Sequence, residues 1–218
     1  MKNGFYRVIV IITKSSEVGF GLFQEKEYYN EHFADMVFSK EELIGVKFYD
    51  CTFTKCDFSE TVFDECRFSD CTFASCDLSM IKLLDSSISQ ASFKQCKLVG
   101  VDWTEASWSR IVVPGTLRFD ECVLNHSTFI GLALPKSVII GCTARNVDFR
   151  ETNLQESNMT ATNFAESLFS DTNLAGADLS HALNYAIDPS VNRISKAKFT
   201  LPEAISLLYS MDIELIED

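Results

Sequence analysis

Residues 51–78 read CTFTKCDFSETVFDECRFSDCTFASCDL, and the residue types in this stretch recur every five positions. Its cysteines lie five or ten residues apart, at Cys51, Cys56, Cys66, Cys71 and Cys76. A Phe or Leu follows two residues after each of them. Such spacing is compatible with a metal site, a disulfide framework or a structural repeat, and the rest of the chain decides among them.

The five-residue period extends far beyond this stretch. Every fifth residue over 33–113 is large and apolar. Near Pro114 and Gly115 the phase shifts by one residue, and the pattern then continues over 119–179 with one small member, Ala144. A second register, two positions earlier, holds mostly Cys, Ser, Thr and Ala, and it contains all eight cysteines.

A period of five matches neither an α-helix nor an ordinary strand. It predicts a chain that turns a corner every five residues and points one large and one small side chain inward on each side. Four sides close a coil of about 20 residues, and coils stack at about 4.8 Å, so we expect about eight coils in a rod near 40 Å long. The phase shift is interpreted as a one-residue bulge at a corner, where Pro114 and Gly115 are well tolerated.

Within this repeat the cysteines are core residues. Cys56 is expected to stack under Cys76, with Cβ atoms about 4.8 Å apart, whereas a disulfide prefers roughly 3.5–4.5 Å. A tetrahedral metal site needs ligands that converge on a point, and a column does not converge. The sequence therefore predicts neither disulfides nor a metal, and it indicates no cofactor.

Several stretches resemble the pentapeptide-repeat proteins. ETNLQESNMTATNFAES and DTNLAGADLS are similar to that family's A-(D/N)-L-x-x repeat. The resemblance implies an all-β fold, a right-handed quadrilateral parallel β-helix over residues 25–199 with a short C-terminal helix.

Longer segments narrow the likeness to the albicidin-resistance members: LVGVDWTEASW, RFDECVLNHSTFIGL and ALNYAIDPSVNRISKAKFTLPEAISLLYSMDIEL. Those members, like the Qnr quinolone-resistance proteins, bind DNA gyrase as mimics of duplex DNA and protect it from inhibitors. Qnr members of Gram-negative bacteria carry protruding loops needed for protection. The one-residue shift predicts no such loop in this chain.

The two ends depart from the repeat. Residues 1–24 form an extension of unknown role, which is an added strand over the first coil, a disordered segment or the result of a start codon assigned too early. In residues 200–218, Thr200 and Glu203 are spaced as a capping box for a short helix. Its apolar residues are Ile205, Leu207, Leu208, Tyr209 and Met211. They close the last coil, and the resemblance implies that they also pair two rods end to end as a homodimer.

The net charge is −12, from 31 acidic and 19 basic residues, which disfavours direct nucleic-acid binding. Coils of 20, with the one-residue shift applied, place on one face the repeats centred on Leu43, Phe63, Leu83, Trp103, Leu124, Ala144, Phe164 and Asn184. The acidic residues of this face are Glu41, Glu42, Asp64, Glu65, Asp85, Asp102, Glu105 and Glu166. They are opposed by Lys82 and Arg145 only, so this face is the predicted partner-binding surface.

Glu65, Asp85 and Glu105 take the same position on successive coils. Like charges stacked in this way are destabilising, which favours a functional reason such as imitation of a phosphate track. The alternative is that acidic side chains keep an exposed β-surface from aggregating.

No enzyme signature is present: the sequence lacks a G-x-G-x-x-G motif, a P-loop and an H-E-x-x-H motif. His32, His126 and His181 fall in separate repeats, so no catalytic residue is predicted. The apolar run YRVIVIIT is too short to span a membrane. We therefore expect a non-enzymatic cytoplasmic protein with reduced thiols.

The functional prediction is a DNA-mimic protein that binds a type II topoisomerase, gyrase or topoisomerase IV, and protects it from an inhibitor. The alternative is a structural or scaffold protein whose rod presents a surface to another protein.

Overall fold

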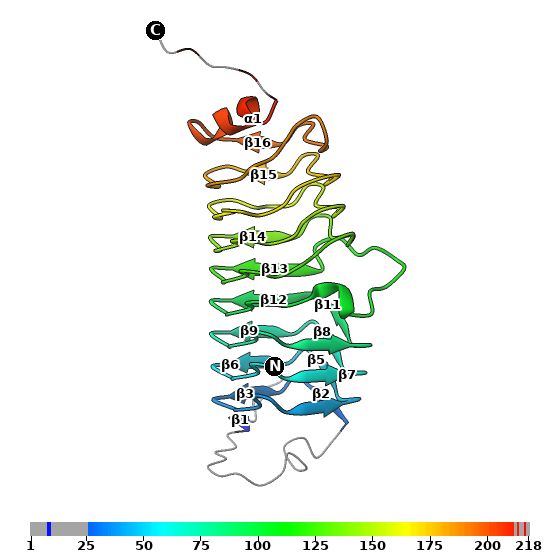
Figure 1. Cartoon of the computed structure of the whole chain (residues 1–218). Coiled ribbons are helices and arrows are strands. Elements are labelled where there is room, and N and C mark those ends of the chain that lie inside the picture. The colour runs from blue at the N-terminus through cyan, green and yellow to red at the C-terminus, as the bar shows by residue number, and fades with distance from the viewer. Residues whose placement is uncertain (1–7, 10–25, 212, 214–215, 217–218) are drawn as a thin grey trace, which may run out of the picture.

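The computed structural model describes residues 8–9, 26–211, 213 and 216, and its body is a stack of about nine turns (Figure 1). Each turn has four sides, and each side pairs in parallel with the same side of the next turn. The predicted fold class, an all-β quadrilateral parallel β-helix with a short C-terminal helix, is confirmed. We name the sides by a central residue near the N-terminal end: the Phe33, Phe38, Leu43 and Phe48 sides.

The Phe33 side carries most of the strands. They are β1 (Val8–Ile9), β3 (His32–Ala34), β6 (Thr52–Thr54), β9 (Thr72–Ala74), β12 (Ala91–Lys94), β13 (Leu117–Asp120), β14 (Val138–Ile140), β15 (Asp178–Leu179) and β16 (Lys198–Phe199). The Leu43 side holds β4 (Glu42–Ile44), β7 (Val62–Asp64), β10 (Lys82–Leu84) and the 3₁₀ turn η1 (Trp103–Glu105). The Phe48 side holds β2 (Glu27–Tyr29), β5 (Lys47–Tyr49), β8 (Arg67–Ser69) and β11 (Ser87–Ser89). The Phe38 side is joined by single bridges, such as Val37 to Asp57.

The large inward side chains form ladders of rings along the rod. On the Phe33 side, Phe53 stacks on Phe33 at 5.0 Å and on Phe73 at 4.8 Å between ring centroids. Rings of neighbouring sides meet edge to face, as Phe48 and Phe53 do at 5.2 Å. Both geometries are favourable for aromatic pairs, so the recurrent Phe both fills the core and ties adjacent turns together.

The small inward residues hydrogen-bond to the preceding turn. The Ser86 hydroxyl donates to the Phe63 carbonyl at 2.9 Å, and the Cys76 thiol lies 3.5 Å from the Phe53 carbonyl in the same relation. All eight cysteines are free and buried. Burial raises the pKa of the Cys66 thiol to about 11 and that of Cys71 to about 12, so these thiols are protonated, unreactive core residues.

Most corners of the coil are made by a residue in the left-handed region. Glu65, for example, has a φ of 51° and Lys55 a φ of 53°. This conformation is unfavourable for residues with a Cβ atom, but each corner N–H donates to the next turn, as Glu65 does to the Leu84 carbonyl at 2.9 Å. The corners are therefore fixed by the stack rather than by their own residue type.

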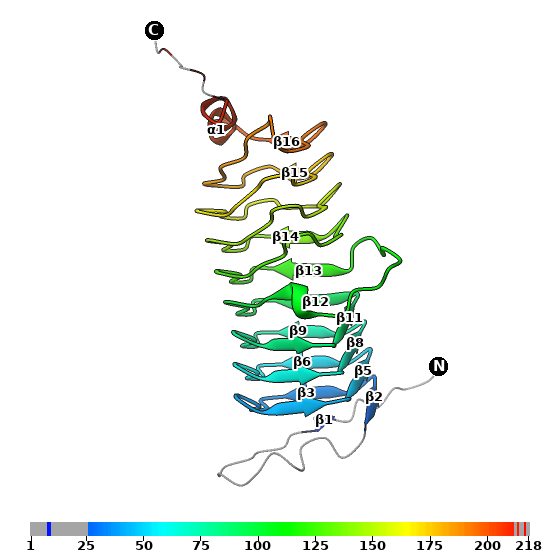
Figure 2. The same cartoon turned by 45° about the vertical axis from the view of Figure 1, so that its right-hand side comes forward.

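The predicted one-residue bulge is wrong. Phe93 pairs with Phe119, so 26 residues separate two positions that are 20 residues apart elsewhere. The six additional residues, Ile111–Thr116, lie in a loop that projects from the rod between η1 and β13 (Figures 1 and 2). The loop leaves the coil at the corner between the Phe48 and Phe33 sides, because Trp108 of the Phe48 side precedes it and Phe119 of the Phe33 side follows it.

The two ends of the rod differ from each other. At the N-terminal end β1 pairs with β3, Val8 with His32 and Ile9 with Phe33, which corresponds to the added strand. The rest of residues 1–24 lies outside the described residues.

At the C-terminal end η2 (Glu203–Ile205) and α1 (Ser206–Tyr209) lie over the last turn. The predicted capping box does not form. The Thr200 hydroxyl accepts from the His181 N–H at 2.8 Å, and η2 has Pro202 as its N-cap with no side-chain bond. Within the part of the chain that the structure describes, no helix is long and apolar enough to cross a membrane.

Candidate functional site

The Leu43 side is the most strongly charged surface of the rod. In the observed register it comprises residues 41–45, 61–65, 81–85, 101–105, 127–131, 147–151, 167–171 and 187–191. Its acidic residues number eleven: Glu41, Glu42, Asp64, Glu65, Asp85, Asp102, Glu105, Asp148, Glu151, Asp171 and Asp188. Its basic residues are Lys82 and Arg150 alone. We call this surface the acidic face.

Both basic residues of the acidic face are neutralised by acids of the same face. Lys82 lies 3.1 Å from Glu105, and Arg150 lies 2.7 Å from Asp148. The remaining nine acidic residues form no ion pair with a described residue. The acidic face therefore presents uncompensated negative charge in each of its segments except residues 127–131.

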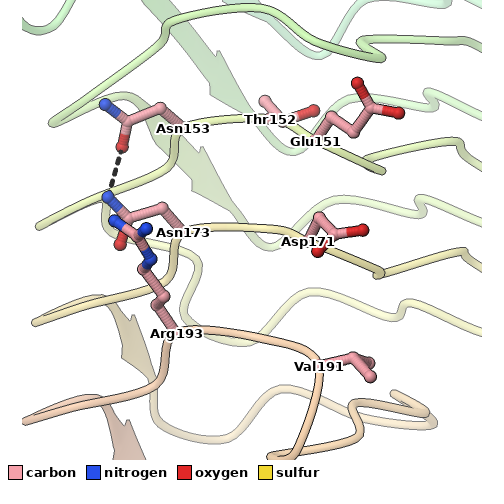
Figure 3. Close-up of a pocket in the computed structure, with 7 residues that line it drawn as sticks. All are labelled: Glu151, Thr152, Asn153, Asp171, Asn173, Val191 and Arg193. Atoms are coloured by element: carbon pink, nitrogen blue, oxygen red, sulfur yellow. Dashed lines mark hydrogen bonds between the residues drawn. The ribbon is translucent and has the colours of Figure 1, made fainter.

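Part of the negative charge is arranged in columns at the corners. Glu65 and Asp85 occupy successive turns of one corner, and Glu151 and Asp171 occupy the same corner further along. Figure 3 shows Glu151, Asp171 and Val191 one above another. Adjacent turns lie about 4.8 Å apart, so each of these two pairs places two like charges close together.

This corner also borders a shallow groove of about 400 Å³ lined by Glu151, Thr152, Asn153, Asp171, Asn173, Val191 and Arg193. Carboxylates stand on one wall, while Asn153, Asn173 and Arg193 stand on the other, where the Asn173 amide donates to Asn153 at 3.0 Å (Figure 3). The groove marks the boundary between the acidic face and the Phe48 side. There seven basic residues outnumber four acidic ones: Lys26, Lys47, Arg67, Arg110, Lys136, Arg193 and Lys196 against Glu27, Asp50, Asp70 and Glu156.

Seven of the eight predicted site residues lie on the acidic face, and Glu166 does not. Phe164 stacks in register with Leu124 and Leu98 through the bridges of the Phe38 side. Glu166 accordingly lies at a corner of that side, where it forms an ion pair with Arg145. The six-residue insertion is the cause, because it moves every later repeat by one side relative to the prediction.

The same displacement brings in four acidic residues that the prediction missed: Asp148, Glu151, Asp171 and Asp188. The predicted ladder of Glu65, Asp85 and Glu105 is also incomplete. Glu105 lies in η1, and its carboxylate accepts from Lys82 and from the Leu83 N–H. It is therefore directed back to the preceding turn instead of extending the column.

The projecting loop is the second unusual surface. Its root is fixed on both sides: the Trp108 indole N–H donates to the Trp103 carbonyl at 2.8 Å, and the Gly115 N–H donates to the Pro135 carbonyl at 2.8 Å. Between these anchors Ile111, Val112 and Val113 are exposed, Ile111 by 78%. Anchored loops with exposed apolar tips commonly serve recognition.

The predicted dimerisation residues divide by exposure. Ile205 and Leu207 are half-buried, and Leu207 packs against the core, whereas Leu208, Tyr209 and Met211 are exposed. The segment that follows, residues 212–216, lies largely outside the described residues.

The chemistry available on the acidic face is that of fixed charge. Among the residues that the structure describes, no group of three or more His, Cys, Asp or Glu side chains is placed to hold a metal ion. The carboxylates are held by a rigid β-scaffold, so the face is suited to bind a surface rich in Lys and Arg.

Comparison with known proteins identifies the repeat. A family model described as pentapeptide repeat region matches residues 46–117, and one described as pentapeptide repeats (8 copies) matches residues 148–183. No curated protein matches the chain.

Among solved structures, a trypsin-treated variant of QnrB1, described as a plasmid-mediated fluoroquinolone resistance protein, is 21% identical. The match covers 88% of this chain and 92% of that chain, with a TM-score of 0.59. HetL, a pentapeptide repeat protein involved in heterocyst differentiation regulation from the cyanobacterium Nostoc, is 15% identical and covers 82% of this chain and 87% of its own, with a TM-score of 0.57. At these identities the likeness is one of fold.

Proposed function

The chain belongs to the pentapeptide-repeat proteins, and from that premise we propose that it binds DNA gyrase as a mimic of duplex DNA and protects the enzyme from an inhibitor. One observation carries the proposal: eleven acidic residues and two internally paired basic residues occupy one side of a straight rod. A rod whose negative charge is concentrated on one side has the charge distribution that a DNA-binding groove attracts. The fold likeness to QnrB1, itself a resistance protein by description, is consistent with this function.

Competition for the DNA-binding groove is the proposed mechanism, and it requires no chemistry from the chain. The acidic face occupies the basic groove of the topoisomerase, in the cytoplasm, and thereby reduces the amount of the DNA-bound enzyme that the inhibitor traps. Topoisomerase IV offers a related groove and is the second enzyme to be assayed. The candidate inhibitors are a fluoroquinolone and albicidin.

A supercoiling assay tests the proposal directly. Purified chain is added to gyrase and relaxed plasmid with and without a fluoroquinolone, and in a parallel series with and without albicidin. We expect the purified protein to restore supercoiling in the presence of at least one inhibitor. This should occur at protein concentrations that do not by themselves abolish supercoiling. Absence of both restoration and inhibition for gyrase and for topoisomerase IV rejects the proposed function.

The scaffold function is the second candidate. HetL has the same fold with a TM-score close to that of QnrB1, yet its description concerns the regulation of cell differentiation. The fold alone thus does not separate the two functions. A chain that leaves both topoisomerases unaffected, with and without inhibitor, favours the scaffold.

The loop is proposed to be a second contact with the enzyme. Deletion of residues 111–116 joins Arg110 to Leu117 and restores the 20-residue spacing. Arg110 then becomes a corner residue, a position that Gln90 and Lys136 occupy with φ values of 51° and 59°. We expect the melting temperature to change by only a few degrees and protection to fall about tenfold, because the apolar tip is lost.

A length-preserving variant is the control for the loop deletion. Replacement of Ile111, Val112 and Val113 by serine keeps the chain path and removes the apolar tip, so its protection should fall to a similar extent. Full protection by both loop variants assigns the loop no part in binding.

We also propose that the exposed residues of the C-terminal segment join two rods into a homodimer. Replacing Leu208 and Tyr209 by aspartate should convert a dimer into a monomer, since two charges on each copy oppose burial of this apolar surface. Size-exclusion chromatography with light scattering measures the mass of both proteins. A wild-type chain that elutes as a monomer at micromolar concentration contradicts the dimer.

A further inference from the structure

Exposed apolar side chains are distributed unevenly around the rod. Along the turns, apart from the loop and the C-terminal segment, large exposed apolar residues occur at Tyr29, Val37, Ile44, Met80, Leu84, Leu168, Leu183 and Val191. Four of them, Ile44, Leu84, Leu168 and Val191, belong to the acidic face. Among the described residues of the Phe33 side between 31 and 200 there are none. Three more, Val37, Met80 and Leu183, lie on the Phe38 side, so what distinguishes the acidic face is the combination of exposed apolar residues with uncompensated negative charge.

Within the acidic face these apolar residues alternate with carboxylates. Ile44, Asp64 and Leu84 occupy one outward column of β4, β7 and β10, as the pairing of Ile44 with Asp64 and of Asp64 with Leu84 shows. Ile44 is 57% exposed and Leu84 is 44% exposed. Glu65 and Asp85 directly follow this column at the adjacent corner. An apolar side chain thus lies on each side of a carboxylate, about one turn away in either direction along the rod.

A surface that imitated phosphates alone would gain nothing from exposed isoleucine and leucine, because a phosphate track offers only charge and polar atoms. Apolar side chains become useful when the partner presents apolar groups between its basic ones, as protein surfaces do. Their burial contributes an attraction that salt does not screen, whereas the attraction between charges weakens with ionic strength.

We propose that Ile44 and Leu84 are contact residues of the acidic face and that its partner is a basic protein groove with apolar side chains set among its Lys and Arg residues. This inference rests on the proposed function and specifies how the same face recognises the enzyme. Charge sets the approach and the salt dependence, and the two apolar side chains supply affinity that persists at high salt.

The experiment uses the full chain and gyrase in a binding titration over a series of potassium chloride concentrations. The variant is Ile44→Thr with Leu84→Thr. Threonine is common in strands, and Thr104 already occupies the same column as Ile44 and Leu84, in the turn after Leu84. The fold is therefore expected to be kept.

The matched control is Val37→Thr with Leu183→Thr on the Phe38 side, where the exposed fractions are 56% and 46%. Thr143 occupies the column of Val37 there. Thermal melting of both variants confirms that they are folded.

We expect the Ile44/Leu84 variant to bind about 10-fold to 100-fold more weakly at every salt concentration, with an unchanged slope of log Kd against log salt. The Val37/Leu183 control should bind within about twofold of the wild-type chain, as expected for a surface that the partner does not contact. Equal binding by the two variants overturns the inference and leaves the proposed function in place. Absence of binding by the wild-type chain overturns the proposed function and this inference with it.

Discussion

Gyrase protection is expected to be lost when Glu65, Asp85 and Glu151 are replaced together by lysine. All three carboxylates are exposed at corners of the acidic face and form no ion pair with a described residue. Each replacement turns an attraction to a basic groove into a repulsion, and like charges brought together at an interface cost several kcal/mol. We therefore expect binding to weaken at least 100-fold, which corresponds to about 2.8 kcal/mol. Titration of gyrase with the purified protein measures the change in Kd.

The fold should tolerate these three replacements, because lysine already makes corners of this coil. Lys40, Lys55, Lys136 and Lys196 have φ values of 64°, 53°, 59° and 60°. The matched control is Asp35→Lys, Asp50→Lys and Asp70→Lys, which changes the net charge equally at left-handed corners of the Phe33 and Phe48 sides, with φ values of 53°, 54° and 57°. Equal loss of binding in the two triple variants would show that total charge matters and the acidic face does not.

The period of five made the fold predictable from sequence, because all four sides of the coil need a large inward residue at the same position of the repeat. The assignment of repeats to sides was not predictable in the same way. An interruption of one residue and one of six residues shift the pentapeptide phase identically, so Val113 and Phe119 fit either reading. Only the pairing of Phe93 with Phe119 distinguishes them. The repeats over residues 31–110 lie on their predicted sides, and every repeat after the loop lies one side away from its predicted one.

Charge holds a signal that could have found the correct register. Moving the later repeats by one side transfers Glu166 away from the acidic face and brings Asp148, Glu151 and Asp171 onto it. The register with six additional residues therefore separates charge more completely than the register with one. By contrast, the orientation of Glu105 could not be read from its position in the repeat, since it depends on η1 and on the Lys82 side chain of the preceding turn.

The largest loss of stability is expected from Phe53→Ala. The Phe53 ring is fully buried, stacks on Phe33 and Phe73, and meets Phe48, Phe58 and Phe68 edge to face. Truncation removes all five ring contacts and leaves a cavity in the narrow core, which should cost about 3–5 kcal/mol. For a chain of this size the melting temperature should fall by about 10 °C, measured by circular dichroism.

The position of the damage should also be visible, because each turn of a solenoid contacts only its neighbours. The turns around Phe53 are expected to unfold before those beyond the loop, so limited proteolysis on heating should cleave first on the N-terminal side of Phe93. Phe53→Leu is the control: leucine occupies central positions at Leu43, Leu83 and Leu124, and the replacement should cost about 1 kcal/mol. If the alanine variant melts no lower than the leucine variant, the ring ladder does not hold adjacent turns together, and the recurrent Phe would then serve only to fill volume.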